Sequence, residues 1–309
     1  MKPAIFVTAT LTEEARDVLK GFEVFEGEAA DLALAKSRVL MAWPTQIKGD
    51  LLRRMRRLRM VQALSAGVDG LDFKSLASGV QVYSNAGAYT ESVAEHAWGL
   101  LLGAAKGLHV RKKRIVPVKL GGGTLLVVGC GAIGSEIARL GRSIGMKTIG
   151  VSRSFKHPGV FNERHSVGNL KVAIREADAV AIALPLTKET TRLVDYEMLM
   201  LSKDAVILVN VGRGDVVSEK GLIRWLRERP ESRYTTDVFW KRSGKETFDT
   251  KAWNLPNFSG TLHHSGTPLG ERLEGPLAEA AKNVRRYLKT GEARNMVRVT
   301  EYLPSESLP

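Results

Sequence analysis

The sequence predicts an α/β protein of two domains, the larger one built on a doubly wound parallel sheet. A length of 309 residues fits about two domains of ordinary size. Short apolar strands alternate with helical segments along most of the chain, as expected of parallel sheets. The apolar residues 125–128 run into a Gly-x-Gly-x-x-Gly turn, and residues 135–145 have helical spacing. Strand, tight turn and helix in this order are typical of a dinucleotide-binding sheet.

The first part of the chain, to about residue 85, indicates a small parallel α/β domain. Strands are expected at residues 4–7, 39–43, 60–64 and 80–83. A capped helix begins after Thr12. A long helix then runs from Thr90 to about His109, and a connector at residues 111–123 ends it.

The second part begins at Thr124 and again alternates strands with helices. Its strands are expected at residues 125–128, 148–151, 179–184, 205–210 and 234–239. Helices are expected at residues 170–176, 219–229 and 277–288, and a returning segment at residues 295–302. Because these strands are continuously apolar, we expect both faces of the sheet to be buried.

The composition excludes several classes of protein. With 44% hydrophobic and 26% charged residues, the chain reads as an ordinary soluble globular protein. No stretch approaches the roughly 20 apolar residues of a membrane span, and the start is a first strand rather than a signal peptide. The one cysteine, Cys130, cannot form an internal disulfide, which fits the cytoplasm. Cys130 occupies a free position of the glycine turn, so we do not expect a nucleophile there.

The net charge of +13 raises the question of nucleic acid. The densest basic run, residues 53–59, carries apolar residues at helical spacing, which predicts an amphipathic helix with a solvated basic face. A second run, residues 111–114, falls in the connector. No nucleic-acid motif accompanies either, so we expect no nucleic-acid partner and a positive field that attracts anionic substrates and a phosphorylated cofactor.

The glycine turn assigns separate roles to its three glycines. Gly129 makes the turn, Gly131 lets the backbone approach a pyrophosphate, and Gly134 lets helix and strand pack closely. The helix that begins at Ala132 and Ile133 directs its N–H groups at the phosphates.

The residues after the next strand bear on the choice of cofactor. An NAD site usually has an acidic residue about 20 positions beyond the turn, but this sequence has Ser152, Arg153 and Ser154 there. Arginine and serine would bind a 2′-phosphate that a carboxylate would repel. We therefore expect NADP in preference to NAD; the alternative is that Arg153 lies along the adenine.

Polar groups that suit hydride transfer to a 2-keto acid follow the later strands, where ligands of parallel sheets bind. The residues at these strand ends are the apolar Leu184, Pro185 and Val211 and the polar Arg213, Asp237, His263 and Ser265. An arginine can hold the carboxylate and polarise the carbonyl. A histidine can exchange the hydroxyl proton, and a carboxylate can orient that histidine.

The motifs resemble those of the D-isomer-specific 2-hydroxyacid dehydrogenases, in the same order and over residues 40 to about 302. They comprise residues 65–69, 85–87, 93–95, the glycine turn, residues 210–214, 237–239 and the histidine loop. The resemblance implies a Rossmann-type sheet inserted in a smaller flavodoxin-like domain. We expect a substrate domain at residues 1–98, with 285–309 returning to it, and a dinucleotide-binding domain at residues 99–284.

The resemblance also implies residue roles. Ala66, Gly67 and Val68 match the turn that binds the substrate carboxylate. Arg213 matches the catalytic arginine and His263 the acid/base histidine, which is ranked above His264. Asp237 matches the acid near the nicotinamide carboxamide, and Thr90 lies near the nicotinamide end. No metal is expected in the site, and a homodimer is the family expectation.

One residue departs from the family pattern. The glutamate that orients the histidine usually falls five positions after the aspartate of Asp-Val-Phe, where this sequence has Arg242. Glu246 replaces it if the loop has a different length; Asp249 is a poorer candidate, and no partner at all is the third possibility.

We therefore expect an NAD(P)-dependent dehydrogenase that acts on a small 2-keto or 2-hydroxy acid such as glyoxylate or hydroxypyruvate. The alternative is a catalytically weak NADP(H)-sensing protein on the same fold, favoured by the absence of a glutamate at position 242. A basic nucleic-acid-associated protein is a second alternative.

Overall fold

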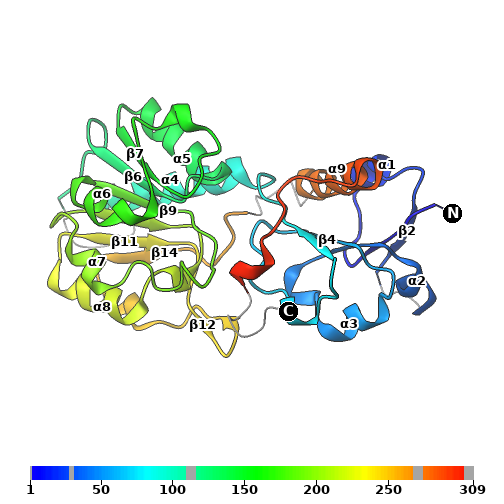
Figure 1. Cartoon of the computed structure of the whole chain (residues 1–309). Helices are drawn as coiled ribbons and strands as arrows, with labels where there is room; N and C mark the ends of the chain where they lie inside the picture. Colours follow the sequence, from blue (N-terminus) through cyan, green and yellow to red (C-terminus); the bar gives the residue numbers. More distant parts are fainter. Residues whose placement is uncertain (1, 28–30, 109–115, 267–273, 303–309) are drawn as a thin grey trace. The chain divides into compact units, whose positions relative to one another are not determined.

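The computed structural model describes residues 2–27, 31–108, 116–266 and 274–302. It divides the chain into two units (Figure 1). Unit 1 comprises Met1–Tyr89 and Leu269–Pro309, and unit 2 comprises Thr90–Pro268. No helix within the described ranges is long and apolar enough to cross a membrane.

Unit 1 is a parallel sheet with helices. Its strands are β1 (Ala4–Val7), β2 (Glu23–Glu26), β3 (Val39–Ala42), β4 (Met60–Ala63) and β5 (Gln81–Tyr83), in the order β2-β1-β3-β4-β5. This is the flavodoxin-like order, so the expected fold of the smaller domain is confirmed. Its helices are α1 (Glu13–Val18), α2 (Asp31–Lys36), α3 (Gly49–Arg54) and α9 (Glu274–Thr290).

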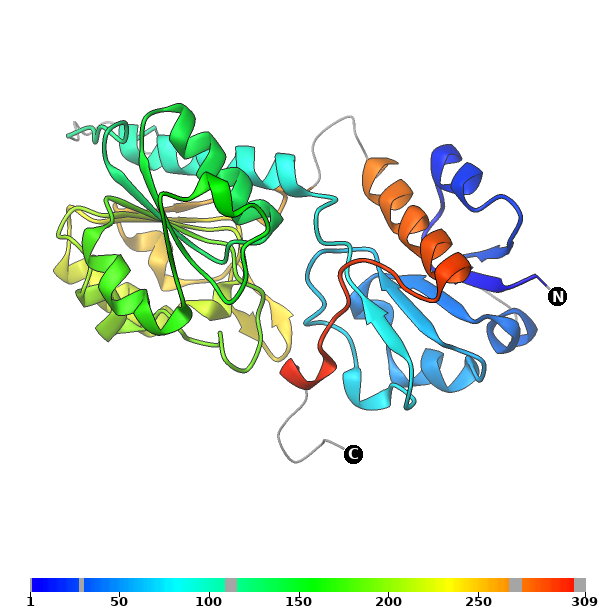
Figure 2. The ribbon, with the colours of Figure 1, turned by 45° about the horizontal axis from the view of Figure 1, so that its top comes forward.

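The end of the chain belongs to this unit. Helix α9 lies beside α1 (Figure 2), and Arg285 Nη1 donates to the carbonyl of Val18 at 2.6 Å. Beyond α9, the N–H of Val297 donates to the carbonyl of Val82 at 2.8 Å, so the expected returning segment contacts β5.

The predicted basic helix over residues 53–59 is wrong in its extent. Helix α3 ends at Arg54, and Met55 already leaves helical conformation (φ −95°, ψ 64°). Met55 and Leu58 are nevertheless buried, because a turn closed by the Leu58 N–H and the Met55 carbonyl leads the chain back toward β4. The helical spacing of these two apolar residues therefore comes from burial at a turn and not from a helix.

Unit 2 is built on a seven-stranded sheet in the order β14-β11-β10-β9-β6-β7-β8. The strands are β6 (Thr124–Val128), β7 (Lys147–Val151), β8 (Glu163–His165), β9 (Ala179–Ile182), β10 (Ile207–Asn210), β11 (Arg233–Thr236) and β14 (Phe258–Gly260), all paired in parallel. Apart from the added β14, this is the Rossmann order, which confirms the predicted fold class. A short hairpin, β12 (Lys241–Arg242) and β13 (Lys245–Glu246), stands apart from the sheet.

Helices cover both faces of this sheet (Figures 1 and 2). Helices α4 (Thr90–Lys106) and α5 (Ala132–Ser143) pack on one face. Helices α6 (Leu170–Glu176), α7 (Tyr196–Met200) and α8 (Glu219–Glu228) bury their apolar residues on the other. Continuous apolar strands such as β6 and β9 are buried for this reason.

The unit boundaries fall earlier than the expected residues 98/99 and 284/285. The whole of α4 belongs to unit 2, where Trp98 Nε1 donates to the carbonyl of Ile137 at 3.0 Å. Arg233 also donates to the carbonyls of Ala104 and Ala105 at the end of α4. The basic run at residues 111–114 lies outside the described residues.

Candidate active site

The glycine turn joins β6 to α5. Gly129 has φ +99°, and a Cβ there would lie 2.7 Å from the carbonyl oxygen of Ala183. A Cβ at Gly134 would overlap the carbonyl oxygen of Gly129, so helix and strand pack as closely as the motif requires. Gly131, the N-cap of α5, has nothing within 4 Å of its Cβ position. The turn thus combines two glycines packed against protein with one that faces open space, ahead of Ala132 and Ile133.

Cys130 lies inside this turn and is fully buried. Burial raises the pKa of its thiol to about 12. Since the thiolate is the nucleophilic form, this cysteine is a packing residue, as its free position in the motif predicts.

Ser152, Arg153 and Ser154 follow β7, at the expected adenosine end. Arg153 Nη1 lies 3.4 Å from Glu189 Oε2, and both side chains are exposed. An exposed ion pair of this kind is weak, so the guanidinium can exchange Glu189 for an anionic ligand. On the neighbouring strand end, the backbone of Leu184, before Pro185, packs against Gly212.

The loop after β10 holds Arg213. The side chain of Asn210 ties this loop together: its Oδ1 accepts from Gly212 N–H, and its Nδ2 donates to the Arg213 carbonyl, both at 3.0 Å. A Cβ at Gly214 would overlap the carbonyl of Phe239, which explains why Arg213 needs glycine beside it. Val211, also expected near the cofactor, is buried in the same loop.

His263 contacts Glu246, the first of the candidates that the sequence offered in place of position 242. The distance from His263 Nδ1 to Glu246 Oε2 is 2.5 Å. Because a carboxylate accepts but does not donate, Nδ1 carries the proton of this hydrogen bond. The other oxygen, Oε1, accepts the N–H of Phe239 at 2.6 Å, which fixes the carboxylate. His263 has φ 51°, an uncommon backbone conformation for a residue other than glycine.

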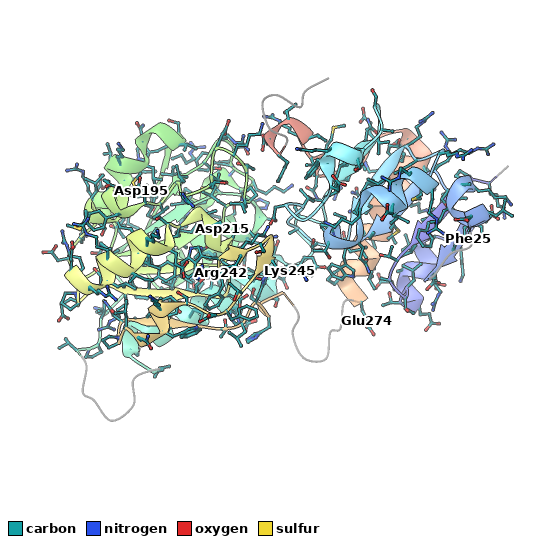
Figure 3. The ribbon with its side chains drawn as sticks, turned by 90° about the horizontal axis from the view of Figure 1, so that it is seen from below. Phe25, Asp195, Asp215, Arg242, Lys245 and Glu274 are labelled. Atoms are coloured by element: carbon teal, nitrogen blue, oxygen red, sulfur yellow. The ribbon has the colours of Figure 1, made fainter. Side chains whose placement is uncertain are left out.

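The hairpin β12–β13 explains the shift from position 242 to position 246. Ser243 and Gly244 both have positive φ (49° and 78°), as a two-residue type I′ turn requires. Glu246 is paired directly with Lys241, whereas Arg242 is paired with Lys245; the latter two are labelled in Figure 3. Successive residues of a strand face opposite sides.

Arg242, which has the family spacing, therefore faces the opposite side of the hairpin from Glu246. Arg242 Nη2 binds Glu219 Oε1 at 2.9 Å, while Glu246 binds the histidine. Asp249, the poorer candidate, offers its backbone carbonyl to Arg242.

Asp237 follows β11 and is fully buried. Its Oδ1 accepts from the Thr261 hydroxyl at 2.7 Å and from His264 N–H at 3.1 Å, and its Oδ2 accepts from Ser265 N–H at 3.0 Å. Burial raises the pKa of Asp237, but these hydrogen bonds together lower it further, so the pKa lies below its ordinary value. Asp237 is thus a fixed anion that organises the histidine loop.

His96 was missed from the sequence, and no contact with Asp237 was predicted for Thr261 or for His264. His96 Nε2 lies 2.7 Å from Thr261 Oγ1, and its ring meets the ring of His264 edge-on at 5.4 Å. Burial lowers the pKa of His96, and the nearby His264 lowers it further against the opposing effect of Asp237. One signal was available: Ser92 and His96 are polar and four residues apart on an apolar helix, and Ser92 binds the Ser265 carbonyl.

The expected substrate turn lies in unit 1 and the expected nicotinamide residue Thr90 starts unit 2. Ala66, Gly67 and Val68 follow β4, at its carboxyl end. The Ser65 hydroxyl donates to the Gly67 carbonyl at 2.8 Å, and Asn85 N–H donates to the Ser65 carbonyl. The turn is therefore braced at both ends within its own unit.

Comparisons with known proteins agree with this geometry. A family model described as D-isomer specific 2-hydroxyacid dehydrogenase, NAD binding domain, matches residues 76–265. A glyoxylate reductase of Aeropyrum pernix is 32% identical over 268 residues, covering 77% of this chain and 79% of that one. A glyoxylate reductase of Thermococcus kodakarensis is 29% identical over 322 residues of alignment, covering 94% and 95%.

A solved structure points to the same family. A Pyrobaculum aerophilum protein assigned as a formate dehydrogenase is 31% identical, with a TM-score of 0.83 and coverage of 97% of this chain and 100% of that one. The chain therefore belongs to the D-isomer specific 2-hydroxyacid dehydrogenase family and is an oxidoreductase that acts on hydroxy acids with a nicotinamide cofactor.

Proposed function

We propose that this enzyme reduces glyoxylate, or a similarly small 2-keto acid such as hydroxypyruvate, with NADPH. The observation that carries the proposal is the contact of His263 with Glu246 beside a dinucleotide-binding sheet. It supplies the orienting carboxylate whose absence at position 242 favoured a cofactor-sensing protein without turnover. The glyoxylate reductases among the relatives support the substrate.

Each catalytic residue has a defined role in the proposed reaction. When bound, the reduced nicotinamide supplies a hydride to the carbonyl carbon of the keto acid. His263 gives the proton on Nε2 to the carbonyl oxygen, which becomes the hydroxyl of the product. Glu246 holds the imidazole in the required tautomer and stabilises its protonated form. Arg213 holds the substrate carboxylate and polarises the carbonyl, while the N–H groups of Ala66–Gly67–Val68 bind the carboxylate.

The cofactor site is proposed to comprise the glycine turn and the strand ends after it. Gly129, Gly131, Ala132, Ile133 and Gly134 hold the pyrophosphate. Ser152, Arg153 and Ser154 bind the 2′-phosphate, with Arg153 leaving Glu189. The nicotinamide end is bounded by Thr90, Leu184, Pro185, Val211, Asp237 and Ser265.

A substrate-by-cofactor panel tests this function. Initial rates are measured with glyoxylate, hydroxypyruvate and larger 2-keto acids, each with NADPH and NADH. We expect a preference for NADPH that Arg153→Ala reduces; a clear preference of the wild type for NADH would overturn the cofactor assignment. Arg213→Ala should lower kcat by about 10²- to 10³-fold, as for loss of a donor to developing negative charge. Unchanged turnover in that variant would overturn the catalytic assignment.

We also propose a homodimer located in the cytoplasm. The buried lone thiol of Cys130 is compatible with a reducing compartment. Sedimentation equilibrium checks the dimer, and a mass of one 33.8 kDa chain across the micromolar range would contradict it.

A further inference from the structure

Unit 2 gathers two imidazoles and a carboxylate that are far apart in the sequence. His96 comes from α4, Asp237 follows β11, and His264 follows β14. One ligand atom from each lies within 4.8 Å of the other two. Within the residues that the structure describes, no other group of this kind brings three potential metal ligands together.

The spacing of these atoms fits a small cation with tetrahedral coordination. Zinc binds histidine nitrogen and carboxylate oxygen at about 2.0–2.2 Å, which places two tetrahedral ligands about 3.3–3.6 Å apart. His96 Nε2 and Asp237 Oδ1 are 3.5 Å apart. The rings of His96 and His264 meet at 89° with centroids 5.4 Å apart. All three ligand atoms lie within 4.8 Å of one another, so binding requires His264 to move closer to the other two.

We propose that His96, Asp237 and His264 form a binding site for a divalent transition metal of the zinc type. Imidazole ligands suit zinc, cobalt and nickel, whereas magnesium and calcium need more oxygen ligands. Three protein ligands leave one coordination position for water. This departs from the expectation of no metal, because the ligands share no local spacing that a sequence could reveal.

The surrounding hydrogen bonds define what binding must change. The Thr261 hydroxyl donates its proton to Asp237 Oδ1, so it accepts a proton from His96 Nε2. A metal takes the place of that proton, and the imidazole then carries its proton on Nδ1. The metal also takes the place of the Thr261 hydroxyl at Oδ1, because that hydroxyl and the His264 N–H already occupy both lone pairs of this oxygen. The N–H of Ser265 keeps Asp237 in position through Oδ2. The carboxylate is therefore pre-oriented and fully buried before a metal arrives.

The site has a consequence for the enzyme, and this step rests on the proposed function. Asp237 is also the carboxylate proposed to lie at the nicotinamide carboxamide. A metal held by Asp237 and the cofactor thus compete for one side chain. The metal is expected to inhibit the enzyme, and NADPH is expected to oppose that inhibition.

Cobalt binding to the full-length protein without cofactor tests the site. Tetrahedral Co²⁺ gives visible absorption bands, and Zn²⁺ should remove them by displacement. We expect one equivalent to bind to the wild type and at least about tenfold weaker binding by His264→Leu, which keeps the backbone N–H that binds Asp237. His96→Gln is the second variant, and far-UV circular dichroism checks that both fold.

His165→Asn is the matched control. His165 also lies beside a carboxylate, 3.3 Å from Glu163, but at the end of β8 and outside the group. It should bind Co²⁺ like the wild type. Wild-type affinity in both His264→Leu and His96→Gln, or no tetrahedral band in the wild type, would overturn the metal site.

Steady-state inhibition by Zn²⁺ separates this inference from the proposed function. We expect inhibition competitive with NADPH, reversed by a chelator and weakened in His264→Leu relative to that variant's own uninhibited rate. Zn²⁺ that binds the cofactor phosphates affects every variant alike, so His165→Asn, which keeps the metal site, should be inhibited like the wild type. Binding without competition would support the metal site and overturn the shared role of Asp237. Normal turnover of 2-keto acids without any metal binding would overturn the site and leave the proposed function standing.

Discussion

At the scale of single residues, the contact between Glu246 and His263 provides the sharpest test of the catalytic proposal. Glu246→Gln removes the negative charge and allows an amide N–H to face Nδ1, so the imidazole loses both its tautomer lock and its charge stabilisation. We expect kcat to fall about 10- to 100-fold, as for other partners that orient a catalytic imidazole, with a smaller change in KM. Steady-state kinetics with glyoxylate and NADPH measure both.

The same hairpin offers the control for this variant. Arg242 occupies the position where the family has its glutamate, but its guanidinium binds Glu219 at an exposed site. Exposed pairs contribute about 0–1 kcal/mol, so Arg242→Gln should leave kcat within about twofold of the wild type. Equal losses in the two variants would show that Glu246 acts through the shape of the hairpin and not through its charge.

Asp237 makes a prediction about pH. Its folded pKa lies below the ordinary value, so its stabilising effect is fully present above the unfolded pKa of about 3.9 and is lost as the pH falls through the lower folded value. Asp237→Asn leaves backbone donors without their charged acceptor and should cost about 2–3 kcal/mol at neutral pH. Urea unfolding at several pH values should show this difference shrinking below about pH 4. A difference that grows on acidification would contradict the assignment.

At the scale of elements, the glycine turn separates packing from ligand binding. Gly134→Ala sets a Cβ against the Gly129 carbonyl and should lower the free energy of unfolding by about 1–3 kcal/mol or more. Gly131→Ala meets open space, so its stability should change by less than about 0.5 kcal/mol. Its cofactor affinity should nevertheless fall at least about tenfold. Thermal unfolding and fluorescence titration measure the two effects, and unchanged affinity in Gly131→Ala would show that the pyrophosphate lies elsewhere.

Elements differ in how well their sequence predicts them. Buried strands such as β1, β3 and β9 are continuous apolar runs, and all were expected. The edge strand β2 was missed, because Glu23–Glu26 holds only two apolar residues between exposed glutamates. The extent of α3 was wrong because spacing alone does not distinguish a helix from a turn that buries the same residues.

At the scale of the whole molecule, the doubly wound fold could be predicted but the contacts among distant loops could not. The end of β10 places Arg213 by topology alone, whereas β14, the strand before His263, was not expected from the sequence. Glu246 was only one of several candidates, because the conformation of Ser243 and Gly244 decides which side of the hairpin faces the histidine. His96 and Thr261 are 165 residues apart, and no local pattern connects them.

The single cysteine allows the opening of the glycine turn to be measured as a rate of thiol labelling. Cys130 is the only thiol in the chain, is buried inside the glycine turn, and has its pKa raised to about 12. It can therefore react with an aromatic disulfide only after the turn opens, and an opened turn cannot hold a pyrophosphate. Cofactor at 100 times its Kd stabilises the closed form by about 2.7 kcal/mol. Labelling should then slow about 100-fold, and at equal concentrations NADPH should slow it more than NADH. Labelling at one rate with and without cofactor would show that the dinucleotide does not bind at this turn.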